Sequence, residues 1–186
     1  MPVAPTPTPI TIRAATAADI PALAALIERS VRILQAKDYT PSQLDSAIGS
    51  VFGIDRQLIA DGTYLVAERD GALLGCGGWS MRATLYGSDH VVSKDNTLLR
   101  PGIDPARIRA FFIDPAYARQ GAGTAILIAC EAAAAAAGFT TLELAATLTG
   151  IPLYQRHGYV AVELTAAPLP NGEALPILRM RKALQT

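Results

Sequence analysis

The glycine-containing segment at residues 119–124 has the residue types and spacing of an anion-binding loop. Its sequence is Arg119-Gln120-Gly121-Ala122-Gly123-Thr124. Because glycine lacks a Cβ atom, the chain turns sharply at Gly121 and Gly123, and backbone N–H groups come close to a bound anion. An alanine-rich stretch that ends at Gly138 follows, and the positive end of its helix dipole points at the same place. The segment therefore predicts a phosphate-binding loop that leads into a helix.

The segment matches neither of two common nucleotide-binding motifs. The Rossmann fingerprint requires a third glycine where this chain has Ile126. The P-loop requires a lysine after its last glycine, whereas Thr124 follows Gly123 here. A Gly-x-Gly before a helix also occurs where a strand and a helix merely pack closely. A nucleotide-binding module is therefore the least favoured hypothesis for this chain.

The segment and its flanks resemble the coenzyme A loop of the GCN5-related N-acetyltransferases. In that family a strand ends in hydrophobic-x-Pro, and Arg/Gln-x-x-Gly-x-Gly/Ala then opens a long helix. The matching residues are Ile113-Asp114-Pro115 and residues 118–123. Ala118 departs from the basic or amide residue of the pattern, which leaves Arg119 or Gln120 to supply that side-chain contact. Backbone amides make most of the phosphate contacts in the family, so the site is still expected.

The resemblance implies acetyl-CoA as the co-substrate and a set of residues that bind it. This set comprises Phe111, Phe112, Ile113, Ala118, Arg119, Gln120, Gly121, Ala122, Gly123, Thr124 and Thr149. It also implies direct acetyl transfer without an acyl-enzyme, in which a backbone N–H of residues 111–113 holds the oxyanion. The sequence specifies neither the length of the acyl group nor the acceptor.

A second block, residues 149–159, resembles the family pattern Asn-x-x-Ala/Pro-x-x-Tyr-x-x-x-Gly-Phe/Tyr. Its Tyr154 matches the tyrosine that the family places near the sulfur of coenzyme A, where it protonates the departing thiolate; Thr149 stands where Asn is usual. A phenol with a pKa of ~10 beside a thiol with a pKa of ~8.5 keeps its proton at neutral pH and shares it as charge develops on sulfur. The competing interpretation of Tyr154 is a half-buried tyrosine that packs an amphipathic helix against the sheet.

Acetyl transfer also requires a neutral amine, and a lysine-like amine with a pKa of ~10.4 must first lose a proton. Four residues are candidate bases, and the sequence singles out none of them: Glu28, Asp89, His90 and Glu143. His157, beside the turn at Gly158, is expected to serve packing or surface solvation.

The acceptor pocket is expected among the first two helices, a hairpin and a long polar loop. Four side chains from these parts are candidates for its lining: Tyr39, Trp79, Tyr86 and His90. A place in the hydrophobic core suits Tyr39 and Trp79 equally well. No cluster of residues with metal-ligand spacing is evident, so no metal is expected.

Apolar periodicity and turn residues indicate the elements that position these motifs. Strands are predicted at residues 10–13, 63–69, 73–83, 108–113, 140–145, 159–165 and 175–180. Helices are predicted after the capping-box-like pair Thr16 and Asp19, after Pro41, between Gly121 and Gly138, and at residues 150–156. Asp70-Gly71 indicates a tight hairpin, and residues 86–105 indicate a long surface loop.

This order of elements is that of the same superfamily, and the resemblance implies an α/β (α+β) fold. We expect a mixed, largely antiparallel sheet of about six to seven strands with about four flanking helices. The central strands, near residues 108–113 and 140–145, are expected to splay apart and admit the pantetheine arm. Residues 1–9, rich in proline, are expected to form a disordered, extended tail, and residues 10–184 a single N-acetyltransferase domain.

The composition argues against several classes of protein. Lys and Arg together number 16, as do Asp and Glu, and no basic run is present, which disfavours nucleic-acid binding. Cys76 and Cys130 lie in separate apolar runs and are interpreted as core residues in a reducing compartment. No segment has the length and apolar character of a membrane span, so we expect a cytoplasmic protein without membrane contact.

Two functional classes remain open on the sequence alone. The first is an N-acetyltransferase that moves the acetyl group of acetyl-CoA directly to a primary amine of a small molecule or peptide. The second is a catalytically silent regulatory domain that binds acyl-CoA, suggested by Ala118, Thr149 and the unassigned base. In either class the last two strands leave a sheet edge that favours pairing with a second copy, so we expect a homodimer.

Overall fold

Seven strands form one mixed sheet in the part of the chain that the computed structural model describes, residues 8–91 and 94–185. They are β1 (Thr11–Ala14), β2 (Tyr64–Arg69), β3 (Ala72–Ser80), β4 (Ala106–Ile113), β5 (Thr141–Thr147), β6 (Val160–Pro168) and β7 (Ala174–Ala183). The order in the sheet is β1-β2-β3-β4-β5-β7-β6, and all neighbours are antiparallel except β4 and β5. The predicted mixed, largely antiparallel sheet is confirmed. The expected tail at residues 1–9 lies almost wholly outside the described residues.

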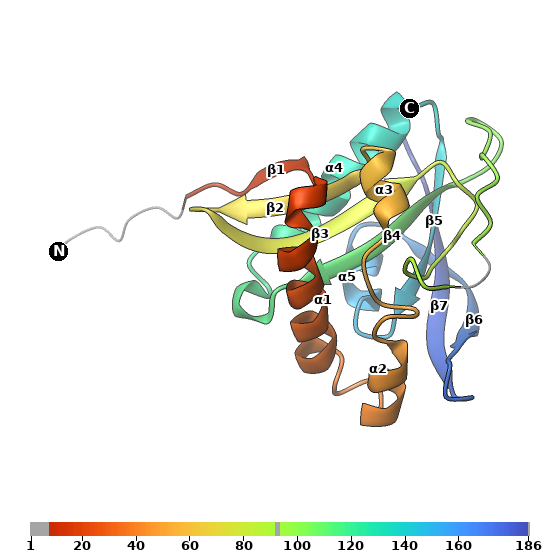
Figure 1. Ribbon diagram of the computed structural model, residues 1–186. Helices are drawn as coiled ribbons and strands as arrows, with labels where there is room; N and C mark the ends of the chain where they lie inside the picture. Colours follow the sequence, from red (N-terminus) through yellow and green to blue (C-terminus); the bar gives the residue numbers. More distant parts are fainter. Residues whose placement is uncertain (1–7, 92–93, 186) are drawn as a thin grey trace.

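Five α-helices cover the two faces of the sheet within the same residues. They are α1 (Ile20–Leu34), α2 (Pro41–Ala47), α3 (Arg56–Ala60), α4 (Ala122–Ala136) and α5 (Ile151–Arg156). In Figure 1, α1, α2 and α3 lie in front of the sheet and α4 lies behind it. The sequence did not predict α3, because five residues are too few to show helical periodicity. Its one local signal is Asp55, whose carboxylate accepts the N–H groups of Gln57 and Leu58 at the start of the helix.

Local sequence signals set the turns beside the central elements. Asp70 and Gly71 both have positive φ, 51° and 77°, as the predicted two-residue hairpin turn between β2 and β3 requires. The backbone N–H of Thr16 donates to the carboxylate of Asp19 at 2.7 Å, which is half of the expected capping box before α1. Gly138, with φ of 89°, follows the end of α4.

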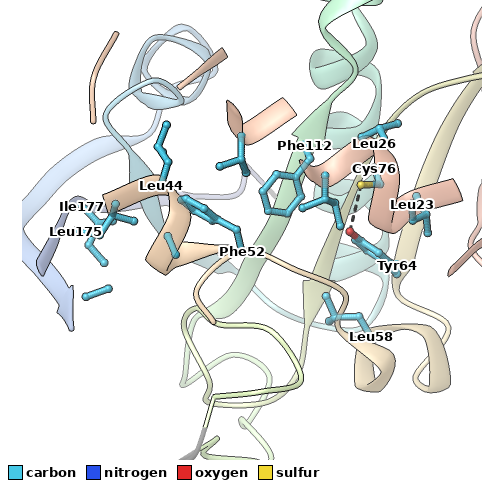
Figure 2. Packing of buried hydrophobic residues seen from close by; sticks show 14 of the residues in the cluster. Leu23, Leu26, Leu44, Phe52, Leu58, Tyr64, Cys76, Phe112, Leu175 and Ile177 are labelled. Atoms are coloured by element: carbon cyan, nitrogen blue, oxygen red, sulfur yellow. Dashed lines mark hydrogen bonds between the residues drawn. The ribbon is translucent and has the colours of Figure 1, made fainter. Parts of the chain in front are cut away.

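Two hydrophobic cores hold the helices against opposite faces of the sheet. The first joins α1, α2 and α3 to the sheet, and in it the rings of Phe52 and Phe112 meet edge to face at 5.9 Å (Figure 2). The second joins α4 and α5 to the sheet through fully buried side chains such as Ile126 and Leu142. Each such side chain contributes about 1.5–3 kcal/mol on burial, so the two cores fix the helices on either side of β4 and β5.

Candidate active site

The parallel strands β4 and β5 separate near the middle of the sheet. Their register consists of the pairs Ala106↔Leu142 and Arg107↔Glu143, both at the beginning of β4. Beyond Arg107, the edge of β4 that faces β5 has no ladder partner among the described residues. Backbone N–H and C=O groups on this edge can therefore bind a ligand. This opening is the splay that the sequence predicted.

A β-bulge in β4 lies at the opening. One residue of β3, Gly77, faces two residues of β4, Ala110 and Phe111. Ala110 has a φ of 57°, a conformation that is uncommon for residues other than glycine. A Cβ atom at Gly77 would lie 2.6 Å from the ring of Phe111, so glycine is required for that ring to lie close to β3. The bulge shifts the alternation of β4 side chains beside the opening.

Tyr64 of β2 supports this bulge from inside the first core. Its side chain is fully buried, and its hydroxyl donates to the carbonyl oxygen of Ala110 at 3.2 Å. The same hydroxyl lies 3.1 Å from Sγ of Cys76, the contact drawn in Figure 2. A non-glycine residue with positive φ costs of order 1–3 kcal/mol. The hydrogen bond from Tyr64 therefore stabilises the strained residue of the bulge.

One cavity lies at the splay, and a second cavity adjoins it. The smaller, of about 70 Å³, is bounded by β4, β5, α5 and the segments before α3 and after β3. The larger, of about 480 Å³, lies between residues 83–91 with Asp95, residues 50–51 and the β6–β7 turn. Val51, Leu85 and Tyr86 line both, so they form a shared wall. The two cavities therefore lie next to each other.

Tyr154 of α5 lines the smaller cavity. Its ring packs edge to face against Phe111 at 6.1 Å and against Tyr159 at 5.7 Å. Its hydroxyl makes no hydrogen bond to the part of the chain that the structure describes. Burial raises the pKa of Tyr154 above its usual value, and the phenol therefore stays protonated at neutral pH. A protonated tyrosine whose hydroxyl has no hydrogen-bond partner in the described residues thus lines the cavity beside the opening of the sheet.

The loop before α4 presents free backbone N–H groups. Gly121 begins the helix with φ of 92°, and the first helical hydrogen bond runs from the N–H of Ala125 to the carbonyl oxygen of Gly121 at 2.9 Å. The N–H groups of residues 122–124 have no helical partner, and no side chain caps this end. Three N–H groups and the helix dipole thus converge on one point, which fits a phosphate group.

The two glycines of this loop have different structural roles. A Cβ atom at Gly121 would meet only Cδ1 of Ile10, at 4.0 Å, so the positive φ and not lack of space requires glycine there. A Cβ atom at Gly123 would lie 3.3 Å from Leu153 of α5, so glycine there allows close packing of α4 and α5. Close packing thus explains Gly123, whereas phosphate binding by the loop stays a prediction.

The side chains of the loop are only partly free. Gln120 accepts a hydrogen bond from Arg69 at 3.2 Å and donates to the carbonyl oxygen of Ala116 at 3.3 Å, whereas Arg119 is exposed. Oγ1 of Thr124 lies 3.1 Å from Nε2 of His157. His157 therefore links the start of α4 to the end of α5, a contact that the expectation of packing or solvation did not include.

The structure distinguishes Thr147 from Thr149. Thr149 donates its hydroxyl to the carboxylate of Asp38, and it lines neither cavity. Thr147, at the end of β5, lines the smaller cavity, and its Oγ1 accepts the N–H of Gly150 at 3.2 Å. The contact of Thr149 with coenzyme A stays a prediction, and the structure adds Thr147 as a candidate that the sequence pattern did not indicate. The available signal for Thr147 was its position at the carboxyl end of a strand, four residues before α5.

A family comparison agrees with this arrangement. The sequence model of the acetyltransferase (GNAT) domain matches residues 60–161, more than half of the chain. The chain belongs to the GNAT acetyltransferase family. The matched region runs from the end of α3 to the start of β6 and contains β4, the loop before α4 and Tyr154. A search of curated protein sequences found no significant match.

Solved structures of GNAT proteins share the fold. A GCN5-related N-acetyltransferase from Rhodopseudomonas palustris is 24% identical, with a TM-score of 0.69 and 99% of each chain covered. The PaiA N-acetyltransferase from Thermoplasma acidophilum, solved in complex with coenzyme A, is 16% identical, with a TM-score of 0.61 over 94% of this chain and 99% of that one. A ribosomal-protein-alanine N-acetyltransferase from Brucella melitensis is 20% identical, with a TM-score of 0.62 over 94% and 99%.

The four side chains expected in the acceptor pocket divide into two pairs. Tyr86 lines both cavities of this GNAT domain, and His90 lines the larger one. Tyr39 is buried in the first core, where its hydroxyl donates to the carbonyl oxygen of Pro176 at 2.7 Å and accepts the N–H of Leu148 at 2.9 Å. Trp79 lies in the second core, 6.1 Å from the ring of Phe139. Neither Tyr39 nor Trp79 lines a cavity, so both have the core position of the alternative interpretation.

None of the four candidate bases lines the smaller cavity. Glu28 pairs with Arg32 on the surface of α1, at 3.0 Å. Asp89 is 2.8 Å from Arg56. Glu143 is buried between Arg107, at 2.7 Å, and Arg181. The three carboxylates thus form ion pairs with arginines. Of the four candidate bases, His90 is the one that lines the larger cavity.

The two cysteines are buried and form no disulfide bond. Burial raises the pKa of Cys76 to about 12, and burial also raises the pKa of Cys130. Within residues 8–91 and 94–185, no group of three or more metal-ligating side chains is present. In the same ranges, no helix has the length and apolar character to cross a membrane.

Proposed function

We propose that the protein is an N-acetyltransferase that moves the acetyl group of acetyl-CoA directly to a primary amine of a small molecule or peptide. The observation that carries the proposal is a set of three features at the opening between β4 and β5 and at the adjoining start of α4, where Gly123 lies near Ile113 of β4 and Leu153 of α5. These features are the unpaired edge of β4, the Tyr154 hydroxyl in the smaller cavity and the free N–H groups of residues 122–124. Residues 10–184 would form this single catalytic domain.

Each feature supports one part of the reaction. Acetyl-CoA supplies the acetyl group, and the N–H groups of residues 122–124 hold its pyrophosphate. A backbone N–H of β4 stabilises the negative charge that develops on the carbonyl oxygen. The acceptor nitrogen forms a bond to the carbonyl carbon as the carbon–sulfur bond breaks. Tyr154 donates its proton to the sulfur, the proton that the amine loses passes to water, and water returns a proton to the Tyr154 phenolate, which closes the cycle.

A panel of primary amines with a thiol-release assay tests this function. Small amines, amino acids and short peptides would each be incubated with acetyl-CoA, and acetyl-CoA binding would be measured separately by calorimetry. Thiol release that depends on an amine supports the enzyme. Tight acetyl-CoA binding without amine-dependent release would instead indicate the silent acyl-CoA-binding domain, and no binding would contradict both.

We also propose that the protein forms a homodimer through β6. This strand is an outer edge of the sheet, and Val160, Val162 and Leu164 on it are exposed apolar side chains. The other edge, β1, has four residues and offers far less pairing surface. A second copy that pairs along β6 would cover both the free backbone groups and the apolar side chains.

Sedimentation at micromolar concentration should show a dimer for the parent protein. Leu164→Lys, which places a charge at a side chain that is 68% exposed, should shift the protein towards monomer. Leu98→Lys, at a position 60% exposed on the long loop, is the matched control and should leave the dimer intact. A parent protein that sediments as a monomer would contradict the proposal.

Tyr64→Phe should lower kcat by about two- to tenfold, the loss expected from one buried hydrogen bond, without changing acetyl-CoA affinity. The carbonyl group of Ala110 loses its donor, so the bulge relaxes and β4 no longer holds the reacting carbonyl as well. Ala110→Gly should restore kcat in the double variant, because glycine adopts positive φ without strain. Steady-state kinetics will be compared among the parent, both single variants and the double variant to test whether Tyr64 acts through the bulge. A double variant as slow as Tyr64→Phe would show that Tyr64 does not act through the bulge.

A further inference from the structure

Arg109 of β4 is the one charged residue among those that line the smaller cavity in the described part of the chain. It stands immediately before the bulge, and its side chain is only 5% exposed. Tyr154 and Phe111 line the same cavity. A buried cation therefore lies beside the place where the acceptor amine would react. The positive charge of Arg109 repels an ammonium group in the cavity and attracts an anionic group.

The guanidinium of Arg109 is incompletely paired. Its Nη2 lies 2.8 Å from Oδ2 of Asp55 and donates to the carbonyl oxygen of Gly87 at 2.9 Å. Nζ of Lys94 lies 3.2 Å from the same Oδ2, so one carboxylate oxygen serves two cations. The Nε atom of Arg109 is buried without a hydrogen-bond partner in the described residues. A buried donor in this state gains from a further acceptor.

The surrounding ionic cluster has a net positive charge. Asp89 lies 2.8 Å from Arg56 and 3.7 Å from Lys94. The three cations Arg56, Lys94 and Arg109 thus face the two carboxylates Asp55 and Asp89, which leaves one positive charge. Burial lowers the pKa of Arg109 even with Asp55 beside it, because one shared carboxylate does not compensate the loss of water.

We propose that the acceptor is an amine that also carries a carboxylate close to the amine, as a free α-amino acid does, and that Arg109 binds this carboxylate. The inference rests on the proposed N-acetyltransferase function. Arg109 and Tyr154 line one cavity of about 70 Å³, so the carboxylate and the reacting nitrogen can be only a few atoms apart. The positive charge of Arg109 also disfavours the ammonium form, which helps to supply the neutral amine in a cavity without a base.

The larger cavity indicates the kind of side chain that the amino acid carries. Most of its walls are apolar, formed among others by Val51, Leu85 and Leu169. Asp95 also lies on this wall, but its carboxylate accepts the backbone N–H of Thr97 at 2.9 Å within its own loop. An apolar or aromatic amino-acid side chain therefore suits this space, and we choose phenylalanine as the probe.

Three matched amines test the inference on the parent protein. L-Phenylalanine has the carboxylate, L-phenylalaninamide has a neutral amide in its place, and 2-phenylethylamine lacks the group. The kcat/KM of the free amino acid should exceed that of both others by at least about tenfold, the usual range for a charged hydrogen bond. Equal values, or a preference for the amide, would overturn the inference and leave the acetyltransferase function intact.

Binding provides a readout that does not depend on turnover. If neither these three amines nor the wider amine panel releases thiol, the proposed function fails by itself, and calorimetry in the presence of coenzyme A then decides the inference. L-Phenylalanine should bind at least about tenfold more tightly than L-phenylalaninamide. Equal affinity would overturn the carboxylate site.

Arg109→Gln should remove the preference for the free amino acid, whereas Arg109→Lys should keep part of it. Arg56→Gln is the matched control, because Arg56 belongs to the same ionic cluster and lines neither cavity. It should keep the preference of the parent. An Arg109→Gln protein that folds and still prefers the free amino acid would contradict the inference. If that variant fails to fold because Asp55 is left unpaired, the amine series on the parent protein still decides.

Discussion

Tyr154→Phe should lower kcat by about a hundredfold to ten-thousandfold, the usual contribution of a general acid, and leave acetyl-CoA affinity nearly unchanged. The substitution keeps the ring between Phe111 and Tyr159 and removes only the hydroxyl at the cavity. Because burial raises the pKa of Tyr154, the lost group is a protonated donor at neutral pH. Single-turnover rates, which isolate the chemical step, and calorimetry with acetyl-CoA provide the two measurements.

Tyr159→Phe is the matched control for this prediction. Tyr159 is also buried and in contact with Tyr154, but it does not line the smaller cavity. Its variant should retain the parent rate. If Tyr154 were a packing residue alone, its variant would show a normal single-turnover rate per folded molecule and at most a lower melting temperature, and the acid assignment would be wrong.

Gly121→Val should weaken acetyl-CoA binding by at least about tenfold, because the loop would lose the conformation that directs three N–H groups at the pyrophosphate. Gly121 has a φ of 92°, which a β-branched residue adopts only at considerable cost. The side chain itself would have room, since its Cβ atom would meet only Ile10 at 4.0 Å. The expected loss therefore comes from backbone strain and not from a side chain that fills the phosphate-binding loop.

Gly102→Val is the control that distinguishes an effect on the phosphate-binding loop from a general effect of backbone strain. Gly102 also has positive φ, 75°, and open space around a Cβ atom, but it precedes β4 and lies outside the loop. Both variants should lose similar amounts of thermal stability, whereas calorimetry should show weaker acetyl-CoA binding for Gly121→Val alone. Parent-like affinity of Gly121→Val would place the pyrophosphate elsewhere.

The sequence could predict the elements around the candidate site because their signals are local. A two-residue turn at Asp70 and Gly71, a glycine start at Gly121 and a glycine stop at Gly138 depend on backbone conformations that few residue types favour. Within a short window of the chain, the spacing of apolar residues then distinguishes a strand from a helix. The family resemblance added the splay between β4 and β5, which the two-pair register confirms.

The positions of individual side chains around the cavity could not be predicted in the same way. The bulge at Ala110 inserts a residue into β4, so the simple alternation of faces fails across residues 109–112. The sequence was compatible with either a pocket or a core position for Tyr39 and Trp79. The structure places Tyr39 in the first core and Trp79 in the second. Thr147 is the last residue of β5, whereas Thr149 lies in the turn that follows the strand. Which of the two lines the cavity therefore depends on where β5 ends, and the tertiary structure sets that end.

What the sequence by itself determined is the family, the order of elements and the loop that presents free N–H groups, because short stretches of chain encode them. What only the tertiary structure decided is which charges meet. Arg109 is separated from Asp55 by more than fifty positions in the sequence, yet they lie 2.8 Å apart beside the cavity. Such long-range pairs depend on how β3, β4 and α3 pack, and they determine whether the cavity favours an anionic or a cationic acceptor.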